Sequence, residues 1–156
     1  MRQLILTRHA KSDWGDPTVA DHDRPLNDRG RRDAPVMARR LAESGTVIER
    51  IISSTALRAR TTAAAFGKAL ELEVELDHEL YLASGHTLLQ KAVEAEAASI
   101  MLVAHNPGIT DLAWSLSEGG IEHMPTCAVA RFVWRTDDWN EAAARPADEW
   151  SLETPR

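Results

Sequence analysis

The sequence predicts an α/β protein: a three-layer sandwich in which a mostly parallel central sheet carries helices on both faces. Its candidate strands are short, continuous apolar runs, which are typical of strands buried on both faces. Helical segments separate these runs, as in chains where helical crossovers join parallel strands. The chain has 156 residues, 44% hydrophobic and 27% charged, which suits one globular domain. We therefore expect residues 1–156 to form one domain around such a sheet.

The expected elements follow from these patterns. Strands are expected at residues 2–7, 50–53, 74–76, 99–104 and 128–134. Helices are expected at residues 28–44, 56–70, 86–98 and 107–116. Turn-forming residues fill the polar loop between the first strand and the first helix, at residues 11–27. The tail from about residue 136 shows no clear period, so its structure is left open.

The first helix has recognisable ends. Asn27 or Asp28 can serve as its N-cap, and Gly45 is suited to follow its last turn. Gly30 and Pro35 fall inside the helix, and both residues disfavour a regular helix interior. We therefore expect its first turns to be weak or kinked.

Cationic and imidazole side chains follow three of the predicted strands. In open α/β sheets, ligands bind where loops leave the carboxyl ends of the strands. Three such exits are expected here, at residues 8–12, 53–58 and 105–108. They carry Arg8 with His9, then Arg58, then His105. Arginine offers a fixed fork of donors that suits phosphate oxygens, so a dianionic phosphate is the ligand that this set favours.

Each of these residues also has a simpler explanation when it is taken alone. An Arg-His pair can be a surface accident, Arg58 can be an ordinary exposed helix arginine, and His105 can be a capping or core-edge histidine. Their shared position at strand exits, in a chain that is otherwise acidic, is what favours a common site.

Four short motifs carry a family resemblance. They are Thr7-Arg8-His9-Ala10, Arg24-Pro25-Leu26-Asn27-x-x-Gly30, Ser53-Ser54-x-x-x-Arg58-Ala59-x-x-Thr62 and Ala104-His105-Asn106-Pro107. Together they resemble the signatures of the histidine phosphatase superfamily, and their order, spacing and short chain most resemble its SixA-like phosphohistidine phosphatase branch. The resemblance covers roughly residues 4–133. It implies a phosphoglycerate mutase-like fold. Ala10 departs from the family's usual glycine, which is tolerable where φ is negative.

The resemblance implies a mechanism and roles for individual residues. His9 would attack phosphorus and become phosphorylated, and water would then hydrolyse this intermediate. Arg8, Arg58, His105 and Asn106 would bind the phosphoryl group, so no metal or cofactor is expected. Physical reasoning agrees, since neighbouring arginines disfavour a protonated imidazole and keep it nucleophilic.

A general acid is less well defined by the sequence. Glu79 follows the third predicted strand, where the superfamily often carries its acid. It can equally be a solvated loop carboxylate, and the sequence does not separate these alternatives. The aspartates of residues 13–23 lack the glycine and terminal glutamate of a calcium loop, so we expect no metal there.

Composition excludes some classes of protein. The net charge of −6 argues against a nucleic-acid-binding protein, because binding the phosphate backbone needs a basic face. No apolar run approaches the length of a membrane span. The single cysteine, Cys127, cannot form an intrachain disulfide. We expect a cytoplasmic protein.

The leading hypothesis is a phosphatase that acts on phosphohistidine in a protein. The alternative is a phosphatase of a small phosphomonoester or nucleotide, so the partner is a phosphorylated protein or a small phosphorylated metabolite. A mutase is less favoured, since the chain has little length to spare for a lid. A non-catalytic module that binds a phosphorylated ligand is a further alternative, and turnover of an aryl phosphate would separate it from an enzyme. Oligomeric state is left open.

Overall fold

A computed structural model describes residues 1–156 and contains one six-stranded sheet with the order β3-β2-β4-β1-β5-β6. The strands are β1 Arg2–Arg8, β2 Arg50–Ser53, β3 Val74–Leu76, β4 Ser99–Ala104, β5 Val129–Trp134 and β6 Glu149–Glu153. The first four in chain order pair in parallel, whereas β5 and β6 are antiparallel. The prediction of a mostly parallel α/β sheet is confirmed.

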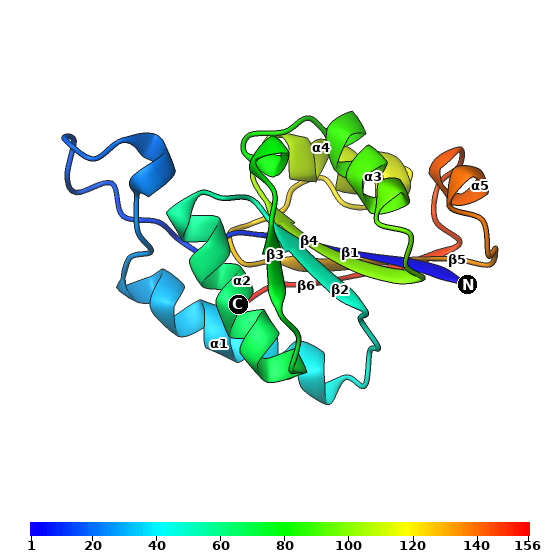
Figure 1. Ribbon diagram of the computed structural model, residues 1–156, viewed down its shortest axis with the longest axis horizontal. Coiled ribbons are helices and arrows are strands. Elements are labelled where there is room, and N and C mark those ends of the chain that lie inside the picture. Colours follow the sequence, from blue (N-terminus) through cyan, green and yellow to red (C-terminus); the bar gives the residue numbers. More distant parts are fainter.

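Helices cover both faces of this sheet (Figure 1). They are α1 Asp28–Glu43, α2 Leu57–Leu70, α3 Gly85–Glu94, α4 Gly108–Leu116 and α5 Trp139–Ala143, with short 3-10 helices at Asp21–Asp23 and His78–Leu80. In Figure 1, α1 and α2 lie on one face, and α3 and α4 lie on the other. No helix of the chain combines the length and the apolar composition that crossing a membrane requires.

The central strands divide their side chains between two cores. In β1, Leu4 and Leu6 pack with α3 and α4, while Ile5 packs with α1 and α2. In β4, Leu102 and Met101 divide between the two cores in the same way. This alternation follows from the two-residue period of a strand, and it explains why the middle of each strand is a continuous apolar run.

Some predicted element boundaries were wrong. α3 ends at Glu94 and not at residue 98, because Glu96 adopts a left-handed conformation with φ of 54° and turns the chain into β4. α1 is continuous through Pro35, so the expected weakness of its first turns is not observed. A proline at this depth removes one hydrogen bond, and the burial of Met37 and Leu41 stabilises the helix despite that loss.

The tail from residue 136, left open by the sequence, forms α5 and β6. Trp139 of α5 is buried and packs edge-on against Trp134. β6 pairs with β5 through backbone hydrogen bonds, but most of its side chains are exposed. An edge strand held by its backbone carries little apolar pattern, which is why the sequence did not reveal it.

The start of α1 holds the loop that follows β1. Asn27 caps the helix, as predicted: its side chain accepts a hydrogen bond from the Gly30 amide at 2.9 Å. The amide of Asn27 in turn donates to the carbonyl of Lys11 at 3.0 Å. A Cβ atom on Gly30 would lie 2.2 Å from that same Lys11 oxygen. Only glycine lets the helix approach the loop this closely.

We predict that Gly30→Ala destabilises the protein, although alanine is the better helix former by about 1 kcal/mol. Relief of the clash with Lys11 requires backbone movement, at a cost of about 1–3 kcal/mol. After subtraction of the gain in helix propensity, the net cost is up to about 2 kcal/mol, so the melting temperature should fall by up to about 8 °C. Exposed Arg32 on the same helix provides the control, since Arg32→Ala should change stability by less than about 0.5 kcal/mol. A melting temperature raised by Gly30→Ala would show that helix propensity outweighs the clash.

Candidate active site

The sheet register brings the three predicted strand exits together. β4 lies between β1 and β2, with Arg8 opposite Ala104 and Ser53 opposite Val103. Beyond the paired strands, the His9 amide donates to the Ala104 carbonyl at 3.1 Å. Three strands that are neighbours in the sheet, β2, β4 and β1, therefore end at the same edge, and the loops that follow them meet there.

A cavity of about 230 Å³ lies at this edge of the sheet. Its lining includes the predicted residues Arg8, His9, Arg58, His105 and Asn106. It also includes Lys11, Ser12, Trp14, Asp21, Arg24, Leu82 and Thr126. A larger hollow of about 640 Å³ between α1 and α2 is lined by alanines with Pro35, Arg39 and Lys68, and it contains no nucleophile. The smaller cavity is therefore the candidate site.

His9 is 6% exposed and has a fixed orientation. Its Nδ1 lies 2.8 Å from the carbonyl oxygen of Ala10. A carbonyl can only accept, so Nδ1 carries the proton and Nε2 keeps its lone pair. Burial, followed by the charges of Arg58 and Arg8, lowers the pKa of His9 to about 3, against the opposing hydrogen bond to Ala10. At neutral pH this imidazole is uncharged.

Helix α2 fixes the backbone next to His9. The amide of Ala10 donates to the hydroxyl oxygen of Thr62 at 2.9 Å, and that hydroxyl donates to the carbonyl of Arg58 at 2.8 Å. Ala10 is buried and is not among the residues with positive φ. Alanine in place of the family's glycine therefore causes no strain.

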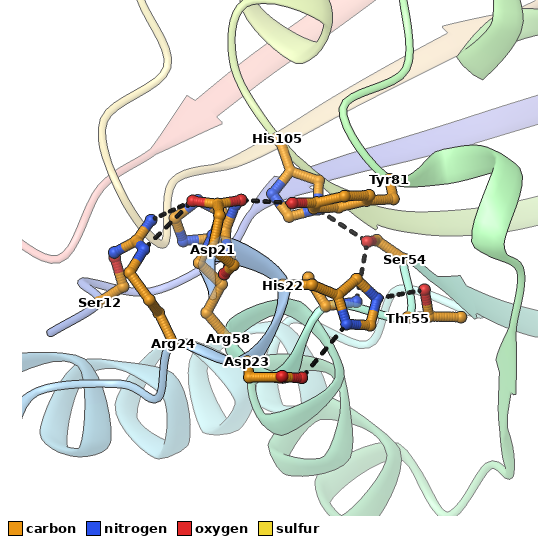
Figure 2. Close-up of polar contacts among 12 residues, drawn as sticks. Ser12, Asp21, His22, Asp23, Arg24, Ser54, Thr55, Arg58, Tyr81 and His105 are labelled. Atoms are coloured by element: carbon orange, nitrogen blue, oxygen red, sulfur yellow. Dashed lines mark hydrogen bonds and ion pairs between the residues drawn. The ribbon is translucent and has the colours of Figure 1, made fainter. Parts of the chain in front are cut away.

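Arg58 is 3% exposed and is clamped by Asp21 (Figure 2). One Nη donates to the Asp21 carbonyl at 2.7 Å, and the other donates to its carboxylate at 3.0 Å. The same carboxylate accepts from the Tyr81 hydroxyl and pairs with Arg24 at 3.1 Å. The bond from Tyr81, assisted by Arg58, lowers the pKa of Asp21 to about 2. Asp21 is therefore ionised at neutral pH.

His105 faces His9 across the site, with ring centroids 5.2 Å apart. Its Nε2 lies 2.7 Å from the hydroxyl of Ser54, and the ring of Tyr81 packs edge-on against it (Figure 2). Burial, followed by the charges of His9 and Arg58, lowers the pKa of His105 to about 3. Both imidazoles are therefore neutral at physiological pH.

The site contains buried polar atoms without protein partners. They are Nε of Arg8, Nε of Arg58 and Nδ1 of His105. A buried polar group without a hydrogen bond costs about 1–3 kcal/mol. Burial, followed by the charge of Arg58, also lowers the pKa of Arg8. An anion seated in the cavity between Arg8 and Arg58 would offset the mutual repulsion of the two arginines.

Comparison with known proteins identifies the family. The sequence model of the histidine phosphatase superfamily (branch 1) matches residues 4–81, half of the chain. The chain belongs to the histidine phosphatase superfamily. A chloroplastic Arabidopsis thaliana protein, described as uncharacterised, is 31% identical over 97% of this chain and 76% of its own length. The mitochondrial serine/threonine-protein phosphatase Pgam5 of Drosophila yakuba is 39% identical over 47% of this chain and 25% of its own.

Solved structures place this histidine phosphatase near SixA proteins. A structure from Agrobacterium tumefaciens, provisionally named a phosphohistidine phosphatase SixA, has a TM-score of 0.79 and 31% identity, covering 86% of this chain and 92% of its own. A second such structure, from Nakamurella multipartitia, has a TM-score of 0.81 and 26% identity, covering 99% of this chain and 96% of its own. Family and neighbours together support a phosphatase.

The structure does not bring Glu79 to the pocket of this phosphatase. Its side chain is 71% exposed and pairs with Lys91 at 2.7 Å. The physical reason is local: the segment after β3 reaches the pocket through Tyr81 and Leu82, whereas the Glu79 side chain pairs with Lys91 at the surface. The carboxylate that lines the cavity is that of Asp21.

Asn106 lines the cavity, but its side chain is engaged in the turn that begins α4. Its oxygen accepts from the Thr110 hydroxyl at 2.7 Å, and its amide nitrogen donates to the Met124 carbonyl at 3.4 Å. We conclude that its direct contribution is to hold the loop that carries His105. No group of three or more histidine, cysteine or acidic side chains is arranged to hold a metal ion.

Several residues of the site were not singled out from the sequence. These are Asp21, Arg24, Ser54, Thr62 and Tyr81. Three of them lie within the family-like motifs, so the motifs were the available signal. Asp21 was interpreted as a turn former and was weighed only as part of a metal loop that its spacing disfavours. Tyr81 lies far from the other residues in sequence, and no local pattern marks it.

We predict that the two neutral histidines make stability depend on pH. Their pKa values lie near 3 in the folded state, below the ordinary value of 6.5, so the unfolded state binds more protons at intermediate pH. The free energy of unfolding should therefore fall as the pH drops from about 6.5 towards 3, by up to about 1.4 kcal/mol per pH unit for each histidine.

Urea unfolding of the double variant His9→Asn/His105→Asn between pH 6.5 and 4.5 checks this dependence. Its free energy of unfolding should vary less with pH than that of the wild type. The variant His86→Asn/His123→Asn removes two exposed histidines and should keep the wild-type dependence. An unchanged dependence in the first variant would show that other groups carry the effect.

Proposed function

We propose that this histidine phosphatase removes phosphate from protein phosphohistidine by way of a covalent phospho-His9 intermediate, without a metal. One observation carries the proposal: His9 presents an unprotonated Nε2 in a pocket with two arginines and a second neutral histidine. A neutral nucleophile beside fixed positive charge is what attack on a phosphoryl group requires.

In the first step, Nε2 of His9 attacks phosphorus while the bond from phosphorus to the substrate nitrogen breaks. The substrate reacts with its ring protonated on the nitrogen that does not carry phosphorus, so the imidazole leaves as a neutral ring that keeps this proton. Arg8, Arg58 and His105 surround the phosphoryl oxygens and stabilise their charge. The Ala10 carbonyl holds the proton on Nδ1 of His9, so the phosphorylated ring carries a positive charge.

Because of that charge, His9 leaves phosphorus as a neutral imidazole in the second step, which makes it a good leaving group. Water attacks phosphorus, the bond from Nε2 breaks, and the water proton passes to the departing phosphate. His9 returns to its starting tautomer, with Nδ1 still protonated against Ala10. Neither step requires a proton to be transferred to or from His9.

The absence of a suitable acid in the pocket favours phosphohistidine over alkyl phosphates. Asp21 has a pKa of about 2 and cannot donate a proton at neutral pH, while Glu79 lies outside the cavity against Lys91. An imidazole with an ordinary pKa near 6.5 leaves without help, whereas an alkoxide needs an acid worth roughly 10²–10⁴-fold in rate. The likeness to the SixA structure at 31% identity supports the same choice.

We also propose that residues 1–156 act as one domain in the cytoplasm. Both apolar clusters pack on a single sheet, which supports one folding unit. The single cysteine, Cys127, is free and buried, which suits a reducing compartment.

We predict a kcat/KM for phosphohistidine at least about 100-fold above that for alkyl monoesters such as phosphoserine peptides and sugar phosphates. Glu79→Gln should leave both values unchanged, since its carboxylate faces Lys91 and solvent. Release of inorganic phosphate from each substrate measures this preference. A wild-type preference for an alkyl phosphate that is lost in Glu79→Gln would instead support a small-molecule or serine/threonine phosphatase.

We predict that His9→Asn abolishes turnover while the protein remains folded, because the residue lies in a loop and contributes little to either core. A denaturing quench at alkaline pH, where a phosphorus–nitrogen bond survives, should trap up to one phosphoryl group per wild-type chain from labelled substrate, and the variant should trap none. His86→Asn, at an exposed histidine, should match the wild type. Labelling of the His9→Asn variant would place the nucleophile elsewhere.

We predict that EDTA leaves the rate unchanged within about twofold, since Arg8 and Arg58 supply the positive charge that a metal would otherwise provide. Initial rates before and after dialysis against the chelator provide the measurement. Loss of activity that magnesium restores would contradict the metal-independent mechanism.

A further inference from the structure

Two exposed apolar side chains stand beside the polar pocket. Trp14 is 69% exposed and Leu82 is 54% exposed, and both line the same cavity as His9 and His105. The cavity therefore combines a charged floor, suited to a phosphoryl group, with an apolar rim. A phosphate ion alone gains nothing from such a rim, but the group that carries the phosphate does.

Arg24 packs against the indole ring of Trp14. The guanidinium carbon of Arg24 lies 3.5 Å from the centre of the Trp14 rings, which is a close cation–π contact. Arg24 is itself 6% exposed and donates to the Ser12 hydroxyl at 2.6 Å and to Asp21 at 3.2 Å. One face of the indole is thus covered by a fixed cation, and the rest of the ring remains open.

The loop that carries Trp14 is tied at both ends. Ser12 forms an antiparallel bridge with Leu26, and the Asp13 amide donates to the Pro25 carbonyl at 2.8 Å. Trp14 directly follows these anchors, so its backbone has little freedom. A large ring held rigidly at the mouth of a pocket offers contact area at low cost in conformational entropy.

The other side of the rim is strained. Leu82 has φ of 54°, in the left-handed region that disfavours residues with a side chain. Such strain is usually retained where it places a side chain that the protein uses. In this conformation the apolar side chain of Leu82 lines a cavity whose other residues are mostly polar. Both apolar side chains are therefore held at the lining of the cavity.

We propose that Trp14 is a specificity-determining residue that contacts a heteroaromatic leaving group, the imidazole ring of phosphohistidine. This inference rests on the proposed function, and it adds a residue that recognises the ring and not the phosphate. Contact between aromatic rings accounts for about a 2- to 12-fold difference in binding. A substrate with the same phosphorus–nitrogen bond but no ring should gain nothing from Trp14.

Phosphohistidine and phosphoramidate form the matched pair of substrates, since both contain a phosphorus–nitrogen bond and only the first has a ring. The variant Trp14→Ala should lower kcat/KM for phosphohistidine by about 2- to 12-fold and leave that for phosphoramidate unchanged. Trp14→Phe, which keeps a ring over Arg24, should retain most of the wild-type preference. Trp114→Ala provides the control, because Trp114 is 56% exposed on α4 and does not line the cavity.

Two results would overturn the proposal. An equal loss for both substrates would show that Trp14 acts by positioning Arg24 and the phosphate site. No loss for either would show that the indole does not contact the ring. Failure of the proposed function is distinguishable from both, because the wild type would then hydrolyse neither phosphorus–nitrogen substrate while still cleaving an alkyl monoester.

Discussion

The parallel pairing of β4 with both β1 and β2 is the constraint on which the site depends. Parallel strands share a direction, so their carboxyl ends lie at one edge, and the register aligns Arg8 with Ala104 and Ser53 with Val103. Residues separated by about fifty positions in sequence thereby become neighbours. The apolar pattern that buries these strands on both faces is therefore also what assembles the polar pocket beyond their ends.

Electrostatic balance inside the pocket is local and does not follow the charge of the whole chain. The protein carries a net charge of −6, yet Arg8, Arg24 and Arg58 converge on one cavity. Asp21 pairs with two of these arginines and accepts a hydrogen bond from Tyr81. It limits the repulsion between cations that would otherwise oppose folding, and it keeps both guanidinium groups oriented before any ligand arrives.

The sequence was informative where a short-range pattern determines the structure. Continuous apolar runs defined the strands, and the rule for strand ends then placed His9, Arg58 and His105 together. The sequence was uninformative about contacts between residues that lie in different loops. Asp21 is 37 residues from Arg58 and 60 from Tyr81, and no periodicity links them. Glu79 was considered as an acid because it follows a strand, but the residues of that segment that reach the site are Tyr81 and Leu82, while Glu79 pairs with Lys91. β6 was not predicted because backbone hydrogen bonds join it to β5 and most of its side chains are exposed, so it lacks an apolar pattern.

Helix α2 serves the nucleophile and the phosphate clamp at once, since Thr62 bonds both to Ala10 beside His9 and to the carbonyl of Arg58. A small rotation of this helix would move the two functions in concert and would preserve their mutual spacing. Substitutions in the core beneath α2, such as at Phe66, therefore cannot adjust nucleophile alignment and anion affinity independently. An engineer who wishes to change one without the other must work from the loop after β4, which carries His105 to the pocket without a bond to this shared hydroxyl.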